Sequence, residues 1–260
     1  MRQSPLIIWK SQYTFLEGVH SIPEVVEWGH RMGARALCLA DKNGLYGAVD
    51  LYCACQEVGI QPLIGTQLVQ GPRHVTIIAR NQTGYEELSE LITRRHLQDF
   101  HMEDDSYPES PNLLYICRDL FLLQQWLRGE GPHNKLFLGL VLSNRKFFRL
   151  VLNLISRRSD LPRVPAVPVV EVNVLTSSDW ALYKVLSAIR LGCTVDTLPA
   201  EELSIREGTG ADLSFLKDLL TGVNPESIPY RPIISGDHVA TLCRLEFDLE
   251  RYRLPMFTPA

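Results

Sequence analysis

One acidic residue stands where an α/β protein would place a metal-binding or catalytic group. Asp41 follows the apolar run 36–40 and comes directly before the polar, glycine-bearing segment Lys42-Asn43-Gly44. A helix-like stretch to Val58 and a second apolar run, 62–65, complete a strand-turn-helix-strand unit. Functional groups of α/β folds gather at the carboxyl ends of parallel strands. Asp41 is therefore a candidate ligand or catalytic carboxylate, provided that partners lie near it.

The elements that would position Asp41 recur along the chain. Further apolar runs of strand length lie at 6–9, 74–80, 113–117, 136–142 and 169–175, and helix-like segments lie at 22–32, 147–155 and 179–191. This alternation favours a mostly parallel sheet, closed or doubly wound. From residue 200 the strands stop, and 212–220 and 237–247 have helical patterns. We therefore expect an α/β domain over 1–199 and a helical extension over 200–260.

The composition is that of an ordinary globular protein. Of the 260 residues, 45% are hydrophobic and 22% charged, and the net charge is -4 with a pI near 6.0. An acidic chain lacks the basic footprint of an autonomous nucleic-acid binder, so any contact with DNA would be indirect. No apolar run approaches the roughly 20 residues of a membrane span, and the N-terminus does not resemble a signal peptide. These patterns predict a cytoplasmic protein without a membrane partner.

Other reactive side chains form no recognisable site. The six cysteines are mostly placed in apolar runs, which is typical of buried free thiols. The clusters Arg94-Arg95-His96 and Arg157-Arg158 are interpreted as solvated faces. Six histidines have no acidic or nucleophilic partner at a recognisable spacing: His20, His30, His96, His101, His133 and His238.

Several motifs together resemble a known family. They are Ser11-x-Tyr13-Thr14-x-Leu16-x-Gly18, Leu39-x-Asp41-x-x-Gly44-Leu45-Tyr46-Gly47, Gly59-Ile60-x-Pro62-Leu63-Ile64-Gly65, Val185–Gly192 and Glu246-Phe247-Asp248-Leu249. The set is similar to the PHP (polymerase and histidinol phosphatase) domain at the N-terminus of the bacterial DNA polymerase III alpha subunit. Parts of it lean toward the error-prone branch of those polymerases.

The resemblance implies a distorted (β/α)7 barrel of PHP type with a metal cluster at the carboxyl ends of its strands. It also implies which positions would hold the metals. Of these, Asp41 and His74 keep a residue able to ligate. The others are substituted, namely Ile8, Lys10, Lys42, Gln67, Asn173 and Leu175.

Two isolated ligands and two added lysines do not make a metal cluster. A protonated lysine offers no lone pair and repels a divalent ion, and Gln67 lacks the charge that holds hard cations. We therefore expect no catalytic metal and no cofactor. Asp41 is expected to pair with Lys10 or Lys42 across the old site, and His74 to bond a neighbouring group.

The implied function is that of a catalytically inactive PHP domain. It would act as a structural and docking module in DNA replication or translesion synthesis. Its partners would be a polymerase core, in cis or as a separate chain, and a proofreading exonuclease subunit. An alternative is a metal-dependent phosphoesterase or 3'-5' exonuclease with an altered metal site. Two further questions stay open: whether the vacated barrel mouth binds another ligand, and whether the chain is an excised domain, a split-gene subunit or a truncated pseudo-polymerase.

Overall fold

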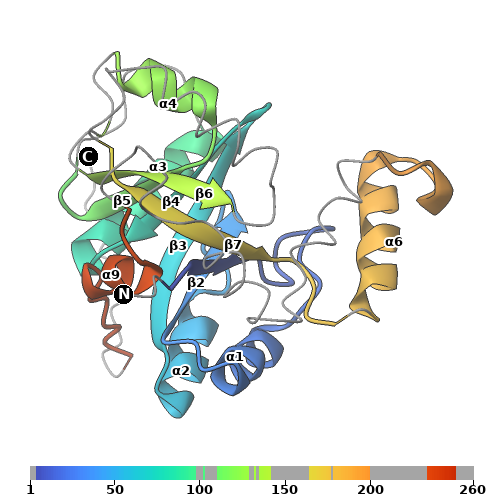
Figure 1. The fold of residues 1–260 in the computed structure, drawn as a ribbon, viewed down its shortest axis with the longest axis horizontal. Coiled ribbons are helices and arrows are strands. Elements are labelled where there is room, and N and C mark those ends of the chain that lie inside the picture. The colour runs from blue at the N-terminus through green and yellow to red at the C-terminus, as the bar shows by residue number, and fades with distance from the viewer. Residues whose placement is uncertain are drawn as a thin grey trace, which may run out of the picture.

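Seven strands close into a barrel in the computed structural model, which describes residues 4–97, 102, 110–128, 132, 135–141, 164–176, 178–199 and 233–249. The strands follow chain order around the barrel (Figure 1). Their bounds are β1 Leu6–Trp9, β2 Ala36–Lys42, β3 Gln61–Gln70, β4 Arg73–Ala79, β5 Leu113–Cys117, β6 Leu136–Val141 and β7 Ala166–Val172.

Five of the seven strand pairings are parallel, and β4 is antiparallel to both of its neighbours. A tight turn at Gly71, whose φ is +55°, joins β3 to β4. Because β4 runs backwards, its first residues lie at the same end of the barrel as the carboxyl ends of the other strands. This end is called the mouth below, and His74 lies there by this reversal.

Strand alternation divides the apolar side chains into an inner and an outer set. Leu6 and Ile8 of β1 belong to the cluster that fills the barrel, while Ile7 and Trp9 belong to the cluster between strands and helices. This is the period of two expected when each strand is buried on both faces. Continuing the inner set by two residues along each strand identifies the side chains that face the mouth.

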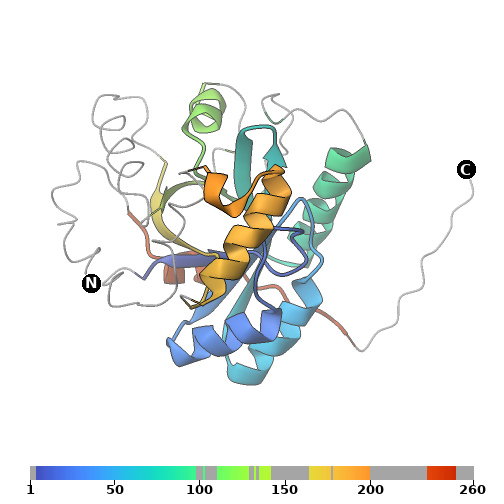
Figure 2. The same cartoon turned by 90° about the vertical axis from the view of Figure 1, so that its right-hand side faces the viewer.

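The helices cover the outside of the barrel. They are α1 Ile22–Arg31, α2 Ala48–Val58, α3 Gln82–Leu97, α4 Leu120–Trp126, α6 Asp179–Leu191 and α9 Gly236–Thr241, with a short 3-10 turn η2 at Val195–Thr197. Helix α1 begins with a capping box, in which the Ser21 backbone N–H donates to Glu24 Oε2 at 2.8 Å. Figure 1 shows α6 standing apart from the other helices, and Figure 2 shows it crossing in front of the barrel.

The segment 233–249 closes the end of the barrel opposite the mouth. Val239, Ala240 and Cys243 complete the inner cluster there, and Gln61 Nε2 donates to the carbonyls of Ala240 and Cys243, both at 2.8 Å. Farther along, Phe247 packs edge-on against Tyr52 and Tyr85, with ring centroids 5.1 and 5.0 Å away. The segment thus ties residues distant in sequence to the barrel.

The α/β barrel class is confirmed, with differences at element ends. Strand β3 extends to Gln70, beyond the predicted run 62–65, and β7 begins at Ala166 despite Pro168. The helix predicted at 237–247 is wrong in its second half, since α9 ends at Thr241 and residues 243–249 have no regular secondary structure. The helices predicted at 147–155 and 212–220 lie outside the described residues. No helix in the described ranges is both long and apolar enough to cross a bilayer.

Candidate functional site at the barrel mouth

The inward positions of the strands change from apolar to polar at the mouth. Lys10 follows Ile8 at the next inward position after β1, and Lys42 follows Ala40 on β2. In the same way Arg118 follows Ile116 after β5, and Glu171 follows Val169 on β7. The barrel therefore presents a ring of charged side chains above its apolar filling.

Two lysines of this ring share one carboxylate. Lys10 Nζ lies 2.7 Å from Glu17 Oε2, and Lys42 Nζ lies 2.7 Å from Glu17 Oε1. Burial raises the pKa of Glu17, but the charges and hydrogen bonds of the two lysines outweigh it and lower the pKa to about 2. Glu17 is therefore ionised at neutral pH, and the pairs are mostly shielded from solvent, since its side chain is 13% exposed.

A tight loop places Glu17 between the lysines. Leu16 has a φ of +60°, and the Gly18 N–H donates to the Thr14 carbonyl at 2.9 Å. A Cβ at Gly18 would lie 1.7 Å from the Ser11 carbonyl oxygen, so only glycine fits. The loop 11–18 is thus folded back against β1, which brings its carboxylate over the mouth.

Asp41 is buried under the same loop and has hydrogen-bond donors of its own. Its Oδ1 accepts from the Ser11 N–H at 2.8 Å, from Ser11 Oγ at 2.9 Å and from Thr14 Oγ1 at 2.8 Å. The Ser11 hydroxyl also lies 2.8 Å from Oδ2. The prediction that Lys10 or Lys42 pairs with Asp41 is wrong, because both lysines bind Glu17 instead. Strand alternation explains this, since Asp41 follows Leu39 on the outward side of β2 and Lys42 follows Ala40 on the inward side.

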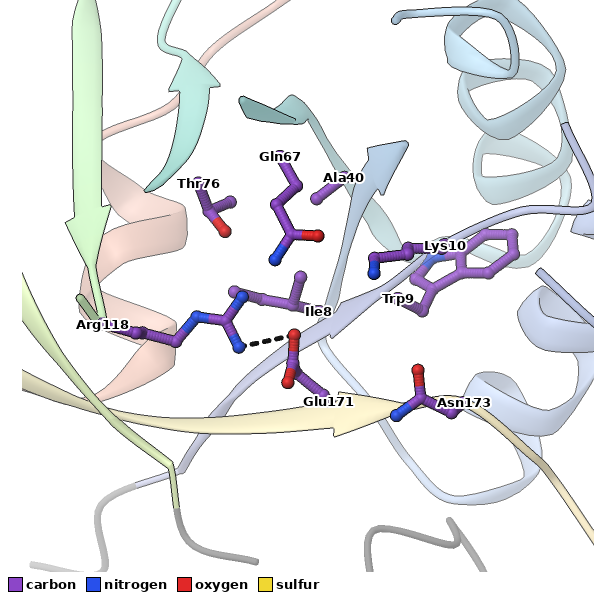
Figure 3. A pocket seen from close by; sticks show the side chains of 9 residues that line it. All are labelled: Ile8, Trp9, Lys10, Ala40, Gln67, Thr76, Arg118, Glu171 and Asn173. Atoms are coloured by element: carbon purple, nitrogen blue, oxygen red, sulfur yellow. Dashed lines mark ion pairs between the residues drawn. The ribbon is translucent and has the colours of Figure 1, made fainter. Parts of the chain in front are cut away.

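A second ion pair crosses the mouth. Arg118 Nη1 lies 2.5 Å from Glu171 Oε1 (Figure 3), and the Arg118 side chain is 5% exposed. Burial raises the pKa of Glu171, but the charges of Arg118, Lys10 and His74 and the Arg118 hydrogen bond outweigh it, so the pKa is lowered. Burial, helped by Arg118, lowers the pKa of His74 against the opposing charges of Asp119 and Glu171. His74 is therefore electrostatically part of this mouth.

A small hollow lies between these groups. It measures about 220 Å³ with the adjoining open solvent, and its side chains leave no enclosed room for a water molecule. Figure 3 shows its lining, namely Ile8, Trp9, Lys10, Ala40, Gln67, Thr76, Arg118, Glu171 and Asn173. Four of the six positions predicted as substituted metal ligands line it: Ile8, Lys10, Gln67 and Asn173.

The other predicted positions lie outside that lining. Lys42 is held by Glu17, and Leu175 packs in the outer cluster while its N–H donates to His20 Nε2 at 3.0 Å. That nitrogen is 3.5 Å from Asp179 Oδ2, a carboxylate that the sequence did not indicate as a partner of His20. Because Nε2 accepts the Leu175 N–H, it has no proton for the carboxylate, and burial lowers the pKa of His20 accordingly. The pair therefore lacks the arrangement of a general base and its orienting acid.

The donor set at the mouth does not suit a divalent metal. The described residues contain no group of three or more histidine, cysteine, aspartate or glutamate side chains that could hold one. Asp41 is surrounded by hydroxyl and amide donors, and ammonium groups lie at two of the expected ligand positions. A divalent cation here would have to compete with the two lysines for Glu17 and with Arg118 for Glu171.

The comparisons with known proteins agree with this barrel. Residues 9–130 match the family model of the PHP domain. This part of the chain is similar to a PHP domain. Over 273 residues, covering 95% of the chain, it is 26% identical to the DNA polymerase III subunit alpha of Halalkalibacterium halodurans, of which the match covers 23%. The error-prone DNA polymerase of Corynebacterium efficiens is 36% identical over 40% of the chain and 10% of that protein.

The chain thus spans about a quarter of the alpha subunit, while the match covers most of the chain's own length. A solved structure of a proposed metal-dependent phosphoesterase from Bifidobacterium adolescentis is 18% identical, with a TM-score of 0.30 over 36% of this chain and 33% of that one. That overlap is too small to compare the two sites. The relationship therefore rests on the sequence matches and on the barrel itself.

Sequence reasoning missed three charged residues of the mouth. Glu17 lies in a segment interpreted only as a loop, and Arg118 and Glu171 lie at the ends of strands. For the last two a signal existed, since each continues the inward alternation of its strand by one more step. For Glu17 only the folding of the loop shows that the carboxylate returns to the mouth.

Proposed function

We propose that this PHP barrel is catalytically silent and serves as a structural and docking module of a DNA polymerase III alpha-type protein. The observation that carries the proposal is the ion-pair arrangement of Lys10, Glu17 and Lys42. Ammonium groups and their shared carboxylate occupy the region in which metal ligands would be expected. The mouth is thus balanced by internal charge pairing, without the charge of a metal.

If the mouth is catalytically silent, the chain should hydrolyse no phosphoester. The test is an assay on a phosphomonoester and on single-stranded DNA with added Mn²⁺ or Zn²⁺. We expect the wild type and Glu17→Gln to give the same hydrolysis rate as the metal solution without protein. Metal-dependent turnover that disappears on Asp41→Asn, in a variant that still folds, would establish the rival phosphoesterase or exonuclease function.

The docking part of the proposal is supported by the solvent side of α6. All five exposed positions of this helix are apolar, namely Ala181, Leu182, Val185, Ile189 and Leu191. Leu182, Val185 and Ile189 are 50%, 44% and 60% exposed, and their spacing places them on one stripe. An exposed helix stripe without charge is unusual in water and is typical of a surface that packs against another segment.

The proposed occupant of this stripe is the polymerase core, in cis or as a separate chain. The alignment with the alpha subunit of Halalkalibacterium halodurans covers 95% of this chain but only 23% of that protein. Most of the relative therefore lies beyond the matched region, and we expect part of it to pack against that region. An apolar stripe facing away from the barrel is a suitable surface for such packing, and DNA contact would be made through the core.

The association is measured by calorimetry with a DNA polymerase III alpha core from the organism that makes this chain. Leu182→Asp combined with Ile189→Asp should weaken binding about tenfold or more, because two charges would be buried against an apolar surface. The matched control is Leu97→Asp, at a 79% exposed leucine on α3, which should bind as the wild type does. Equal binding by the α6 variant and the control would remove α6 as the docking face.

A further inference from the structure

Three buried hydrogen-bond donors at the mouth have no partner among the described residues. They are Nε and Nη2 of Arg118 and Oγ1 of Thr76, and both side chains line the hollow. Leaving a buried donor unpaired costs about 1–3 kcal/mol, more when the group is charged. Such a concentration in one place indicates that a group other than the described residues completes these bonds.

The geometry of Arg118 specifies what kind of group this is. Its Nη1 binds Glu171, which leaves Nε and Nη2, the two nitrogens on one edge of the planar guanidinium. That edge is the fork that takes two oxygens of a carboxylate or phosphate at once. Figure 3 shows Thr76 and Gln67 reaching from β4 and β3 into the space beside the guanidinium.

We propose that the mouth binds a small oxyanion of the phosphate class without a metal. Two oxygens would accept from the free edge of Arg118, and a third from the Thr76 hydroxyl, which approaches from another strand. The two parallel donors of the guanidinium edge, joined by a third donor from another strand, suit a tetrahedral anion better than a planar carboxylate. Lys10 also lines the hollow, although its ammonium is already paired with Glu17. A phosphate would thus satisfy donors that the described part of the chain leaves unpaired.

Entry of the anion requires two side chains to move. The hollow has no enclosed room for a water molecule as it stands, and the unpaired nitrogens of Arg118 are shielded from solvent. Gln67 and Lys10 both end in the hollow and have several rotatable bonds. Gln67→Ala should therefore keep or strengthen binding by opening the space beside the guanidinium.

The experiment titrates inorganic phosphate, and separately a deoxynucleoside monophosphate, into the full chain in the presence of EDTA. Calorimetry follows binding, and circular dichroism checks the fold of each variant. Arg118→Lys keeps a cation for Glu171 but removes the fork, and should weaken binding about tenfold or more. Thr76→Val removes only the hydroxyl and should weaken it about threefold to tenfold. Arg35→Lys, at an arginine 81% exposed on its side chain, is the control and should bind normally.

Each outcome decides the proposal. Saturable binding that falls in both mouth variants and not in the control supports it, and the stronger of the two ligands identifies free phosphate or a nucleotide phosphate as the source. No saturation up to about 20 mM, or equal affinity in all variants, overturns it. Binding that appears only with Mn²⁺ overturns both this proposal and the silent mouth, whereas no binding under any condition leaves the silent mouth intact.

Discussion

Glu17 should be one of the most costly surface-loop residues to replace in this protein. It is the only carboxylate that the structure pairs with Lys10 and Lys42 in the described residues, at 2.7 Å from each. Its pKa falls from the ordinary 4.5 to about 2. At 1.36 kcal/mol per pKa unit, this difference corresponds to about 3 kcal/mol of folding stability at neutral pH. Glu17→Gln keeps the shape and removes the charge, so it should cost an amount of this order.

The same reasoning gives a pH dependence with a definite sign. Because the folded-state pKa of Glu17 is below its unfolded value, the contribution is complete above about pH 5 and is lost as the pH falls from 4.5 toward 2. The stability difference between wild type and Glu17→Gln should therefore shrink over this range. Other carboxylates titrate in both proteins and cancel in the difference.

Urea unfolding followed by circular dichroism measures both effects. The matched control is Glu27→Gln, since Glu27 is 73% exposed on its side chain and lies 4.0 Å from Arg31. This control should change the free energy of unfolding by no more than about 0.5 kcal/mol. A loss below about 0.5 kcal/mol for Glu17→Gln at pH 7, or a loss that does not shrink at low pH, would refute the shared ion pair as a stabilising element.

Three further variants test the loop and the C-terminal segment. Ser11→Ala removes a hydroxyl from buried Asp41 and should cost about 1–3 kcal/mol by urea unfolding, and a neutral result would mean that the hydroxyl is not needed. Gly18→Ala should cost about 3 kcal/mol, since its Cβ would overlap the Ser11 backbone, and unchanged stability would contradict the loop geometry. Phe247→Ala should loosen the packing of segment 233–249 on Tyr85 and make this segment easier to cleave in limited proteolysis. An unchanged cleavage rate would mean that the Phe247 contact does not hold the segment in place.

The sequence predicted the barrel better than the contacts in its mouth. Apolar runs located β2, β5 and β6 closely, because strands buried on both faces consist of continuous apolar residues. The same runs placed Asp41 at a strand end, where it lies. They could not give its partner, because the direction of a side chain depends on strand parity and the position of Glu17 depends on the folding of a loop.

The other contacts of the site could not be predicted because their residues lie far apart in the sequence. Arg118 follows β5 and Glu171 lies on β7, two strands separated by β6, and their side chains meet because both point into the barrel. His74 reaches the mouth because β4 is antiparallel, a reversal that the alternation of strands and helices did not indicate. Extending each strand by one inward step would have identified Arg118 and Glu171 as candidates, though not as a pair.

The metal content of the mouth tests the central claim most directly. The purified chain is dialysed against Mn²⁺ or Zn²⁺, freed of excess ion and analysed for bound metal, with Asp41→Asn as the matched variant and circular dichroism as the check on folding. The account predicts far less than one metal ion per chain, and the same content in both proteins. One or more ions per wild-type chain, lost in a folded Asp41→Asn variant, would contradict it.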